Sequence, residues 1–545
     1  MSQEIFTLHE SNEKTIRTRH WGEQLWVLLL LIAAILIYQM DLGFLPLRDW
    51  DEGIVAGVAR DIYQGSLDWL YPTSAGEPYF NKPPLLHLLI AYAYFWGGVN
   101  EWTTRLPGAM LSALSVPLLY GIAREVFRLR SPAIFSVLVY LTLLPVVRHG
   151  RLAMLDGGVQ CFFLLMVWCL LRSRRNLRWG LGVGIGLGLI CMTKGMMGVL
   201  LGTIAFAFTL WDTPRLLRSW YLWIGIALGM TPVTLWYWAQ WQHYGDAFLS
   251  AHFGIQSLQR IWQPVESNAG PPWYYLLELL KYSWPWFLFL PQGLQLAWEN
   301  RTLSWAKLVG VWTSIYFVAI TVMGTKLPWY VLPLYPAIAL ACGAKLAQVW
   351  ADRKTTEPFT RDPLYPVAWI AILGIISVVL WGGSFYLGVM DPSYGTYLPV
   401  LLISVALTLS ISALLIYHQD RQFVLILFWG MFVSLCLFVS SPHWIWELNE
   451  AYPVKPVAEA IAQQTPPGQQ IYTSFPYHRP SLNFYSDRQV IPATPEQLQQ
   501  YWREQQQPYF LVDRRTLEAL DLGPSHIQNA NEGWLLVTRE PPSAN

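Results

Sequence analysis

Long apolar segments separated by short polar ones run through most of the chain. A helix needs about 20 apolar residues to cross the hydrocarbon core of a membrane. Segments of that kind begin near residues 22, 107, 132, 153, 180, 195, 221, 276, 305, 329, 366, 397 and 421. The pattern therefore predicts an all-α polytopic membrane protein with about 13 transmembrane helices over 22–440.

A further apolar run, "PPLLHLLIAYAYFWGG", begins near residue 83. The positions of the basic loops indicate whether this run crosses the membrane. We place residues 1–21 in the cytoplasm and leave this run out of the count. The basic segments then all fall inside, as the positive-inside rule requires: 124–130, 172–178, 212–218, 351–362 and 418–422. The run is therefore predicted to lie along the outer interface, within a long first outer loop over 41–106 that holds interfacial helices.

The stretch 180–210, "GLGVGIGLGLICMTKGMMGVLLGTIAFAFTL", is too long for one untilted span at about 1.5 Å per residue. Lys194 and Gly195 stand in its middle, and a charge at that depth in lipid is costly. Both facts favour two short helices that meet at the outer face.

After the last span the chain becomes polar and rich in Gln and Pro, over 441–545. By parity this part lies outside, as does a long loop over 240–275. Amphipathic and alternating patterns predict helices at "VKPVAEAIAQQ" and "TPEQLQQYWREQQQ" and strands at "QQIYTSF", "PYFLVD" and "GWLLVTRE". The segment is thus expected to form a small periplasmic α/β domain.

Composition agrees with the membrane assignment. Of the 545 residues 54% are hydrophobic and 13% charged, about half the charged fraction of an average soluble protein. The 30 tryptophans and 28 tyrosines suit helix ends at membrane interfaces. A net charge of +1 predicts no nucleic-acid partner, and the five cysteines lie in apolar runs that favour neither a disulfide framework nor a zinc site.

This topology gathers both carboxylates and cations on the outer face. They are Asp51, Glu52, Lys82, Arg151, Asp156, Lys194, His252, Arg260 and Lys326. A lipid-linked phosphate donor needs an apolar groove for its tail and cations for its phosphate. A carboxylate can then deprotonate the hydroxyl of an acceptor as it attacks the sugar. Such a donor carries its own leaving group, so no nucleotide pocket is needed, and the chain has no phosphate-binding glycine loop.

Each group also has a structural interpretation. Asp51 and Glu52 suit the start of a solvated helix, and Asp156 suits the cap of a span. Lys82 beside Pro83 fits an ordinary snorkelling lysine. A transporter or flippase of a lipid-linked anionic substrate is the alternative function, and it would predict interrupted helices in two related halves. A structural or assembly factor would leave the outer charges unexplained.

Several strings together resemble one family. They are "DWDEGIVAGVARDI", "GEPYFNKPPLLHLLIA", "GVNEWTTRLPGA", "GRLAMLDGGVQCFFLL", "MTKGMMGVLL", "PPWYYL" and "MGTKLPWYVLPLYPAIAL". They are similar to the membrane glycosyltransferases that include the bacterial aminoarabinose transferases acting on lipid A and the protein O-mannosyltransferases. The resemblance covers about residues 20–345 and implies a GT-C fold, a polyprenyl-phosphate sugar donor and inverting transfer on the periplasmic face of the inner membrane.

The resemblance also implies roles for individual residues. Asp51 matches the acidic residue of the first outer loop, the expected base or acceptor-orienting group, and Asp156 matches a second acidic position. The candidate catalytic residues are thus Asp51, Glu52 and Asp156. The candidate donor-phosphate ligands are Lys82, Lys194, Arg151 and Arg260, and the site is completed by His252, Asn81 and Lys326.

Two departures from the family pattern bear on function. The acidic-Lys-Pro-Pro motif reads "NKPP" here, so Asn81 replaces a carboxylate that helps relatives hold a divalent metal with a loop histidine. No cofactor is therefore expected to be required, and metal binding is left open. Ile54 and Val55 follow "DEG" where the aminoarabinose transferases carry an Arg-Tyr pair, so the acceptor is left open as lipid, glycan or protein.

The predicted topology can be tested with a reporter enzyme that is active only outside the inner membrane, fused after Asn545. An odd number of crossings from a cytoplasmic N-terminus places the fusion outside, so we expect an active reporter. An inactive reporter in a fusion that is expressed at full length would require an even number of crossings.

Overall fold

The computed structural model describes residues 13–66, 68–265, 268–351, 365–391, 393, 395–450, 453–520, 522–523, 525–531 and 533–539. The predicted inner loop at 351–362 lies outside these residues except for its first position, and so does most of the predicted N-terminal segment. The chain divides into two compact units. The helical unit comprises Met1–Asp41, Phe80–Leu86 and Gly108–Trp444, and the mixed unit comprises Leu42–Tyr79, His87–Pro107 and Ile445–Asn545.

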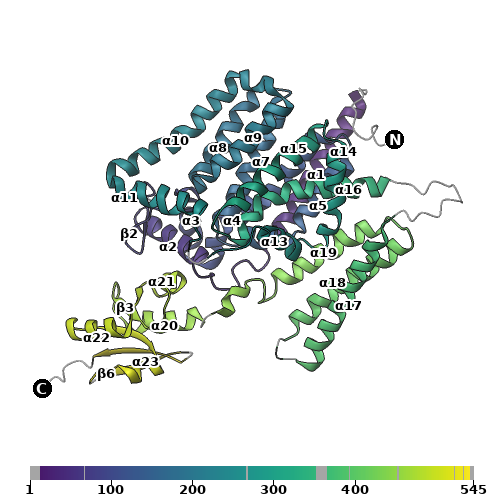
Figure 1. Ribbon diagram of the computed structural model, residues 1–545. Coiled ribbons are helices and arrows are strands. Elements are labelled where there is room, and N and C mark those ends of the chain that lie inside the picture. The colour runs from purple at the N-terminus through teal and green to yellow at the C-terminus, as the bar shows by residue number, and fades with distance from the viewer. Residues whose placement is uncertain are drawn as a thin grey trace. The chain divides into compact units, whose positions relative to one another are not determined.

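The helical unit is built from long apolar helices (Figure 1). Their bounds are α1 Glu13–Gln39, α4 Glu101–Val126, α5 Arg130–Leu141, α6 Leu144–Arg151, α7 Leu155–Ser173, α8 Gly180–Lys194, α9 Met197–Asp212, α10 Trp220–Tyr244, α11 Asp246–Leu249, η4 Ser250–Gln259, α12 Arg260–Trp262, α13 Tyr274–Tyr282, α14 Leu290–Glu299, α15 Ser304–Val322, η6 Pro328–Leu334, α16 Tyr335–Ala351, α17 Val367–Phe385, α18 Tyr397–Tyr417 and α19 Phe423–Val439. Each of the predicted apolar segments contains one of these helices, which confirms an all-α membrane-spanning architecture.

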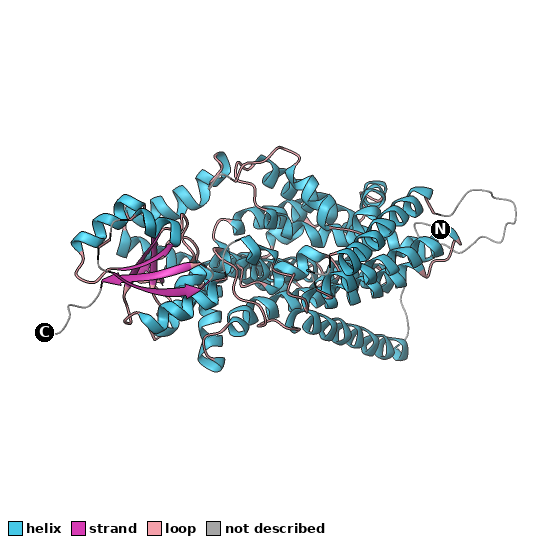
Figure 2. Cartoon of the chain, turned by 90° about the horizontal axis from the view of Figure 1, so that it is seen from below, coloured by secondary structure: helices cyan, strands magenta, loops and turns pink. Residues whose placement is uncertain are grey.

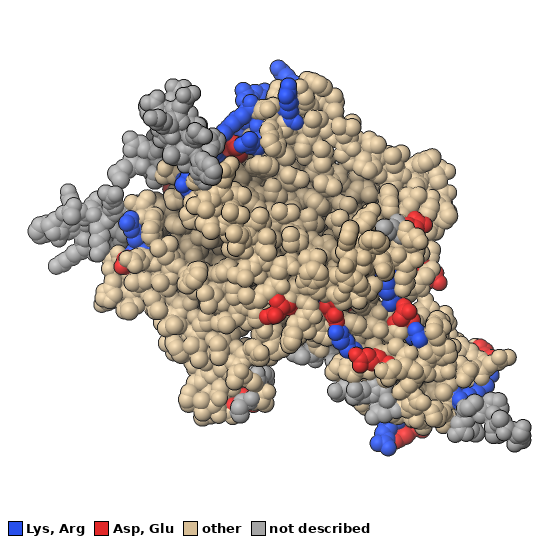
Figure 3. All heavy atoms as spheres, turned by 180° about the vertical axis from the view of Figure 1, so that it is seen from behind, with Lys and Arg blue, Asp and Glu red and all other residues tan. Residues whose placement is uncertain are grey.

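Fewer helices than thirteen are long enough to span by themselves. Within the described ranges, eight are long and apolar enough, or nine if α5 and α6, bent by 58°, form one broken span. Three shorter apolar helices are α3 (Leu85–Gly97), α9 and α19. The number of crossings therefore stays a prediction. The visible face in Figure 3 has a broad band without charged side chains over the helices, as burial in lipid requires.

The predicted break in the stretch 180–210 is confirmed. Helix α8 ends at Lys194 and α9 begins at Met197. Gly195 between them has φ +48°, and a Cβ at this position would lie 2.8 Å from the Tyr237 hydroxyl. A left-handed backbone conformation and a close neighbour therefore both require glycine here.

The mixed unit contains a five-stranded sheet with helices on both faces, and Figure 2 shows its strands. Its elements are α2 Asp51–Gln64, β1 Thr73–Ser74, β2 Glu77–Pro78, the greater part of α3, the start of α4 as far as Pro107, η9 Trp446–Glu450, α20 Val454–Gln464, β3 Gln470–Thr473, α21 Pro480–Ser486, β4 Gln489–Pro492, α22 Pro495–Glu504, β5 Tyr509–Asp513, α23 Arg514–Ala519, β6 Ser525–Asn531 and β7 Trp534–Arg539. The strand order is β4-β3-β5-β7-β6. Strand β3 is parallel to β4 and β5, and β7 is antiparallel to β5 and β6.

Alternating side chains of the central strands supply two hydrophobic cores. On β5, Leu511 joins a core with α20 and α21, whereas Phe510 and Val512 join a core with α22. A strand buried on both faces reads as a continuous apolar run, which is why "PYFLVD" stands out in the sequence. The three predicted strands and two predicted helices are confirmed, while β4, β6, α21 and α23 were not predicted.

Candidate functional site

A cavity of about 570 Å³ lies beside the break between α8 and α9 in the helical unit. Three cationic side chains, Lys82, Lys194 and Arg260, line it. Most of the remaining wall is apolar and comes from the start of α9 and the end of α15, including Met197, Leu200, Val318, Ile320 and Val322. The cavity thus combines a cationic cluster with an apolar groove, and it unites three of the four predicted phosphate ligands.

Lys194 is held at this cavity by Asp156. Its Nζ donates a hydrogen bond of 2.7 Å to Oδ1 of Asp156, in the first turn of α7, and lies 5.7 Å from the centre of the Tyr330 ring. Asp156 is buried, so each charge of the pair is stabilised by the other rather than by water. The structure therefore brings the second predicted carboxylate beside the cavity, as the counter-charge of one lysine.

Lys82 and Arg260 line the same cavity without a counter-ion of their own. Among the described residues neither side chain forms an ion pair within 4.0 Å or a side-chain hydrogen bond, and Nε of Arg260 is buried. Burial lowers the pKa of Lys82 to about 7, and the charges of Lys194 and Arg260 add to this effect. The negative charge of Asp156 raises the pKa of Lys82 and so opposes part of this effect. Cations gathered in a concave, partly apolar site favour an anionic ligand.

Backbone pairing holds the segment that carries Arg260. The Thr325 N–H donates to the Arg260 carbonyl over 3.1 Å, and the Gly324 N–H donates to that of Ile261 over 2.7 Å. Lys326, which follows, donates from Nζ to the carbonyls of Ile320 and Thr321 over 3.1 and 2.6 Å. These carbonyls belong to the last turn of α15, so Lys326 caps that helix. It does not line the cavity.

His252 fixes the backbone just before Lys82. Its Nδ1 lies 2.7 Å from the Phe80 carbonyl oxygen and its Nε2 lies 2.8 Å from the Tyr237 hydroxyl. A carbonyl can only accept, so Nδ1 carries the proton and Nε2 accepts from Tyr237. Burial lowers the pKa of His252 to about 4, which keeps the ring neutral. His252 therefore positions the loop that carries Asn81 and Lys82, both partly buried.

Arg151 lies elsewhere in the helical unit. Its guanidinium is fully buried and donates to the carbonyls of Ile37 and Met40 over 2.6 Å each. It also lies 4.6 Å from the centre of the Trp444 ring. These contacts tie α6 to the end of α1, and Arg151 is not among the residues that line the cavity.

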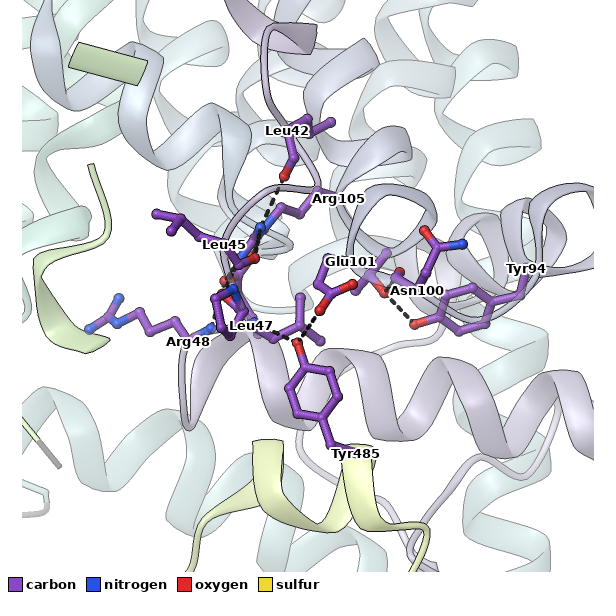
Figure 4. Close-up of polar contacts among 12 residues, drawn as sticks. Leu42, Leu45, Leu47, Arg48, Tyr94, Asn100, Glu101, Arg105 and Tyr485 are labelled. Atoms are coloured by element: carbon purple, nitrogen blue, oxygen red, sulfur yellow. Dashed lines mark hydrogen bonds and ion pairs between the residues drawn. The ribbon is translucent and has the colours of Figure 1, made fainter. Parts of the chain in front are cut away.

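Asp51 and Glu52 belong to the mixed unit, where they open α2. Glu52 is fully buried and accepts hydrogen bonds of 2.8 Å from Nε and Nη2 of Arg105. The remaining N–H groups of Arg105 donate to the carbonyls of Leu42 and Leu45 (Figure 4) and to that of Pro46. All five donors of this guanidinium are thus engaged, which makes the burial of the pair tolerable.

Asp51 has a different environment from its neighbour. It is partly exposed, and its Oδ2 lies 3.4 Å from Nη1 of Arg48. Trp50, at the N-cap of α2, has φ +62°. Sequence reasoning did not single out Arg105 or Tyr237, which hold Glu52 and His252. The one signal for Arg105 was its place in the motif "GVNEWTTRLPGA".

The described residues include no group of three or more His, Cys, Asp and Glu side chains that could hold a metal ion. Asn81 offers an amide where relatives have a carboxylate, and both ring nitrogens of His252 are already engaged. These two residues therefore do not fit a divalent metal site.

Comparison with known proteins points to one group of enzymes. A family model described as dolichyl-phosphate-mannose-protein mannosyltransferase matches residues 81–238. The undecaprenyl phosphate-α-4-amino-4-deoxy-L-arabinose arabinosyl transferase 1 of Pseudomonas fluorescens Pf-5 is 28% identical over 396 residues, 71% of this chain and 70% of the relative. The corresponding enzyme of Erwinia tasmaniensis is 27% identical over 66% of each chain.

Solved structures show the same fold. The crystal structure of ArnT from Cupriavidus metallidurans bound to undecaprenyl phosphate matches with a TM-score of 0.77 and 19% identity, over 95% of this chain and 99% of that one. The Archaeoglobus fulgidus oligosaccharyltransferase matches with a TM-score of 0.52 and 13% identity, over 88% and 66%. The predicted GT-C fold is confirmed.

The buried, neutral His252 makes stability depend on pH. An unfolded histidine binds a proton below about pH 6.5, whereas the folded one stays neutral down to about pH 4. The unfolded state therefore binds more protons between these values, and stability falls as the pH drops through this window. We expect the Tm of the detergent-purified protein to fall from pH 6.5 to 4, and to fall less in His252→Gln. Equal pH dependence of both proteins would contradict this assignment.

Proposed function

We propose that this chain, which is a membrane glycosyltransferase with the GT-C fold, moves a sugar from a polyprenyl-phosphate donor to an acceptor on the periplasmic face of the inner membrane. The observation that carries the proposal is the cavity in which Lys82, Lys194 and Arg260 meet an apolar groove. The acceptor, whether lipid, glycan or protein, is left open.

The groove suits a polyprenyl tail because its walls are apolar and continue onto the lipid-facing surface. Val199 on α9 and Val318 and Val322 on α15 line the cavity, yet their side chains are 61%, 59% and 67% exposed. Exposed apolar side chains on spanning helices are expected to face lipid. A tail lying between α9 and α15 would thus pass from the cavity into the bilayer without crossing a polar surface.

The cationic cluster suits the phosphate of the donor. With Lys82 protonated, the three cations and the carboxylate of Asp156 leave two uncompensated positive charges at the cavity. A sugar-linked phosphodiester carries one negative charge, which rises to two on the free phosphate as the sugar leaves. Lys and Arg therefore bind the donor and also stabilise the charge that develops on the leaving group.

The reaction we propose is a single displacement at the anomeric carbon of the sugar. The acceptor hydroxyl gives its proton to a carboxylate while its oxygen forms the new glycosidic bond. The bond to the phosphate oxygen breaks on the opposite face, and the phosphate keeps the electron pair. One displacement inverts the anomeric configuration, and no metal-dependent step is invoked.

We assign the base role to Asp51 rather than Glu52. Both carboxylate oxygens of Glu52 are engaged by Arg105 inside the protein, so Glu52 can neither reach nor accept a substrate proton. Asp51 is partly exposed at the start of α2, in the motif shared with the family. Asp156 keeps Lys194 in place, and Lys326 and His252 hold backbone beside the cavity. Arg151 ties α6 to the end of α1 and is given no part in the reaction.

Lipid extracts from cells with and without this protein test the proposed function. We expect a polyprenyl-phosphate sugar to accumulate in its absence, together with loss of the same sugar mass from an acceptor. The wild-type chain should reverse both changes. Asp51→Asn should not reverse them, although it should bind undecaprenyl phosphate as the wild type does, because only the base is lost.

Two outcomes would contradict these assignments. No change in any lipid-linked sugar would remove the transferase proposal and favour transport. Full complementation by Asp51→Asn would remove Asp51 from the base role while leaving transfer intact. Asp61→Asn, on the same helix, is a matched control, because Asp61 bonds to the hydroxyl of Thr73 and the N–H of Gly76 within its own loop.

The lowered pKa of Lys82 predicts a pH dependence of donor binding. With a pKa of about 7, Lys82 loses its proton in the free protein as the pH rises through 7. A polyprenyl phosphodiester, whose charge is constant from pH 6 to 9, should therefore bind more weakly as the pH rises above 7. Lys82→Arg should bind with little pH dependence, because arginine stays protonated. Identical pH profiles for both proteins would exclude Lys82 as a phosphate ligand.

A further inference from the structure

We propose that the C-terminal α/β domain is a positioning element of the catalytic machinery, which holds the loop and helix that present Asp51. The inference rests on the role proposed above for Asp51 and adds positioning residues to it. All contacts that carry it lie within the mixed unit. They reach residues immediately before and after Asp51 in the chain.

The first contact holds Asp49, two residues before Asp51. Nε of Arg479 lies 2.6 Å from Oδ2 of Asp49, and the Ser481 N–H donates to Oδ1 over 3.2 Å. The Ser481 hydroxyl donates to the same oxygen. Both carboxylate oxygens of Asp49 are thus bound by residues at the start of α21. Charge-assisted hydrogen bonds of this kind are the strong ones, and two of them fix the direction of a side chain.

The second contact lies at Gly53, two residues after Asp51. A Cβ at Gly53 would lie 2.5 Å from the Ser481 nitrogen and 2.9 Å from the Pro480 carbonyl carbon. Real Cβ atoms do not approach backbone so closely, so the start of α21 packs directly against the backbone of α2. The glycine of the motif "DEG" is therefore required by the approach of the C-terminal domain.

A third contact reaches the loop before α2. The Tyr485 hydroxyl accepts from the Leu47 N–H over 2.8 Å and donates to Oε1 of Glu101 over 2.9 Å (Figure 4). Glu101, in the first turn of α4, also pairs with Lys455 of α20. Tyr485 thus joins the loop to α4 through a single hydroxyl group.

A fourth contact lies further along α2. Nη1 of Arg60 donates to the Phe484 carbonyl over 2.9 Å and lies 3.2 Å from Oδ1 of Asp487. Arg60 thereby binds the end of α21 while Gly53 packs against its start. Helix α21 therefore lies along α2 over about two turns.

Together these contacts hold chain positions on both sides of Asp51. Leu47, Asp49, Gly53 and Arg60 are each held by residues between 479 and 487, and Asp51 lies among them in the chain. The buried pair of Glu52 with Arg105 fixes the same turn from the protein interior. A partly exposed carboxylate on so firmly held a backbone suits a base that must meet an acceptor in one geometry.

Substitution of the ion pair between Arg479 and Asp49 tests the inference in the full-length enzyme. Arg479→Gln and Asp49→Asn should each lower transfer by about tenfold to a hundredfold, because a shift of about 1 Å in a reacting group has that effect. The double variant should lose no more than the larger single loss, since both changes break one interaction. Arg479→Lys should restore part of the activity.

Two further measurements separate positioning from folding. The affinity for undecaprenyl phosphate should stay within the error of wild type in all four variants, and the loss of activity should exceed what any fall in Tm explains. Arg514→Gln is the matched control, because Arg514 forms an exposed ion pair with Glu518 in the same domain, and it should keep full activity. Gly53→Ala is an independent second variant that should also lower turnover, by displacing α21.

Wild-type turnover in Arg479→Gln and Gly53→Ala would overturn the inference, provided that Asp51→Asn is inactive in the same assay. Loss of activity only in proportion to lost Tm would also overturn it, since the domain would then act through folding alone. An active Asp51→Asn would instead contradict the proposed function, so failures of the two proposals are distinguishable.

Discussion

Lys194 and Asp156 carry opposite charges inside an apolar helix bundle, and each is the counter-charge of the other. Their hydrogen bond of 2.7 Å joins the end of α8 to the start of α7. Removing one partner of a buried pair typically costs about 3–5 kcal/mol, because the other charge is left without solvent. The break between α8 and α9 brings Lys194 to this position, and the cavity opens beside that break. The position of Lys194 at the cavity therefore depends on this pair and on Gly195, which permits the turn.

A second buried pair has a comparable function in the mixed unit. Arg105 uses every donor it has, two on Glu52 and three on the carbonyls of the preceding loop. Arg105 thereby fixes the loop over residues 42–46, which forms neither helix nor strand. The two adjacent carboxylates thus have different surroundings: Glu52 forms a buried ion pair with Arg105, whereas Asp51 is partly exposed and lies beside Arg48.

Much of the architecture could be predicted from local patterns. Hydrophobic periodicity within their own residues predicts the apolar segments and the elements α20, α22, β3, β5 and β7. The break at Lys194 is predicted by a charge in the middle of an apolar stretch. Short elements with weak patterns were missed, among them α21, whose seven residues begin with proline. Of the four residues predicted to bind the donor phosphate, Lys82, Lys194 and Arg260 line one cavity, whereas Arg151 binds backbone carbonyls. Lys326, predicted as a further site residue, also binds backbone carbonyls, and the roles of all these residues stay predictions.

By itself, the sequence determined that this chain is a helical membrane protein with a polar C-terminal domain and a set of charges bound to particular motifs. Burial of apolar surface in lipid and the cost of unpaired charge constrain each segment separately. Apolar spans and the charged positions within them can therefore be recognised from the local sequence. Only the tertiary structure decided which charges pair with each other, which reach the cavity and which elements hold Asp49 and Gly53. Those partners are up to 432 residues apart in the chain, and no local pattern encodes a contact made at that separation.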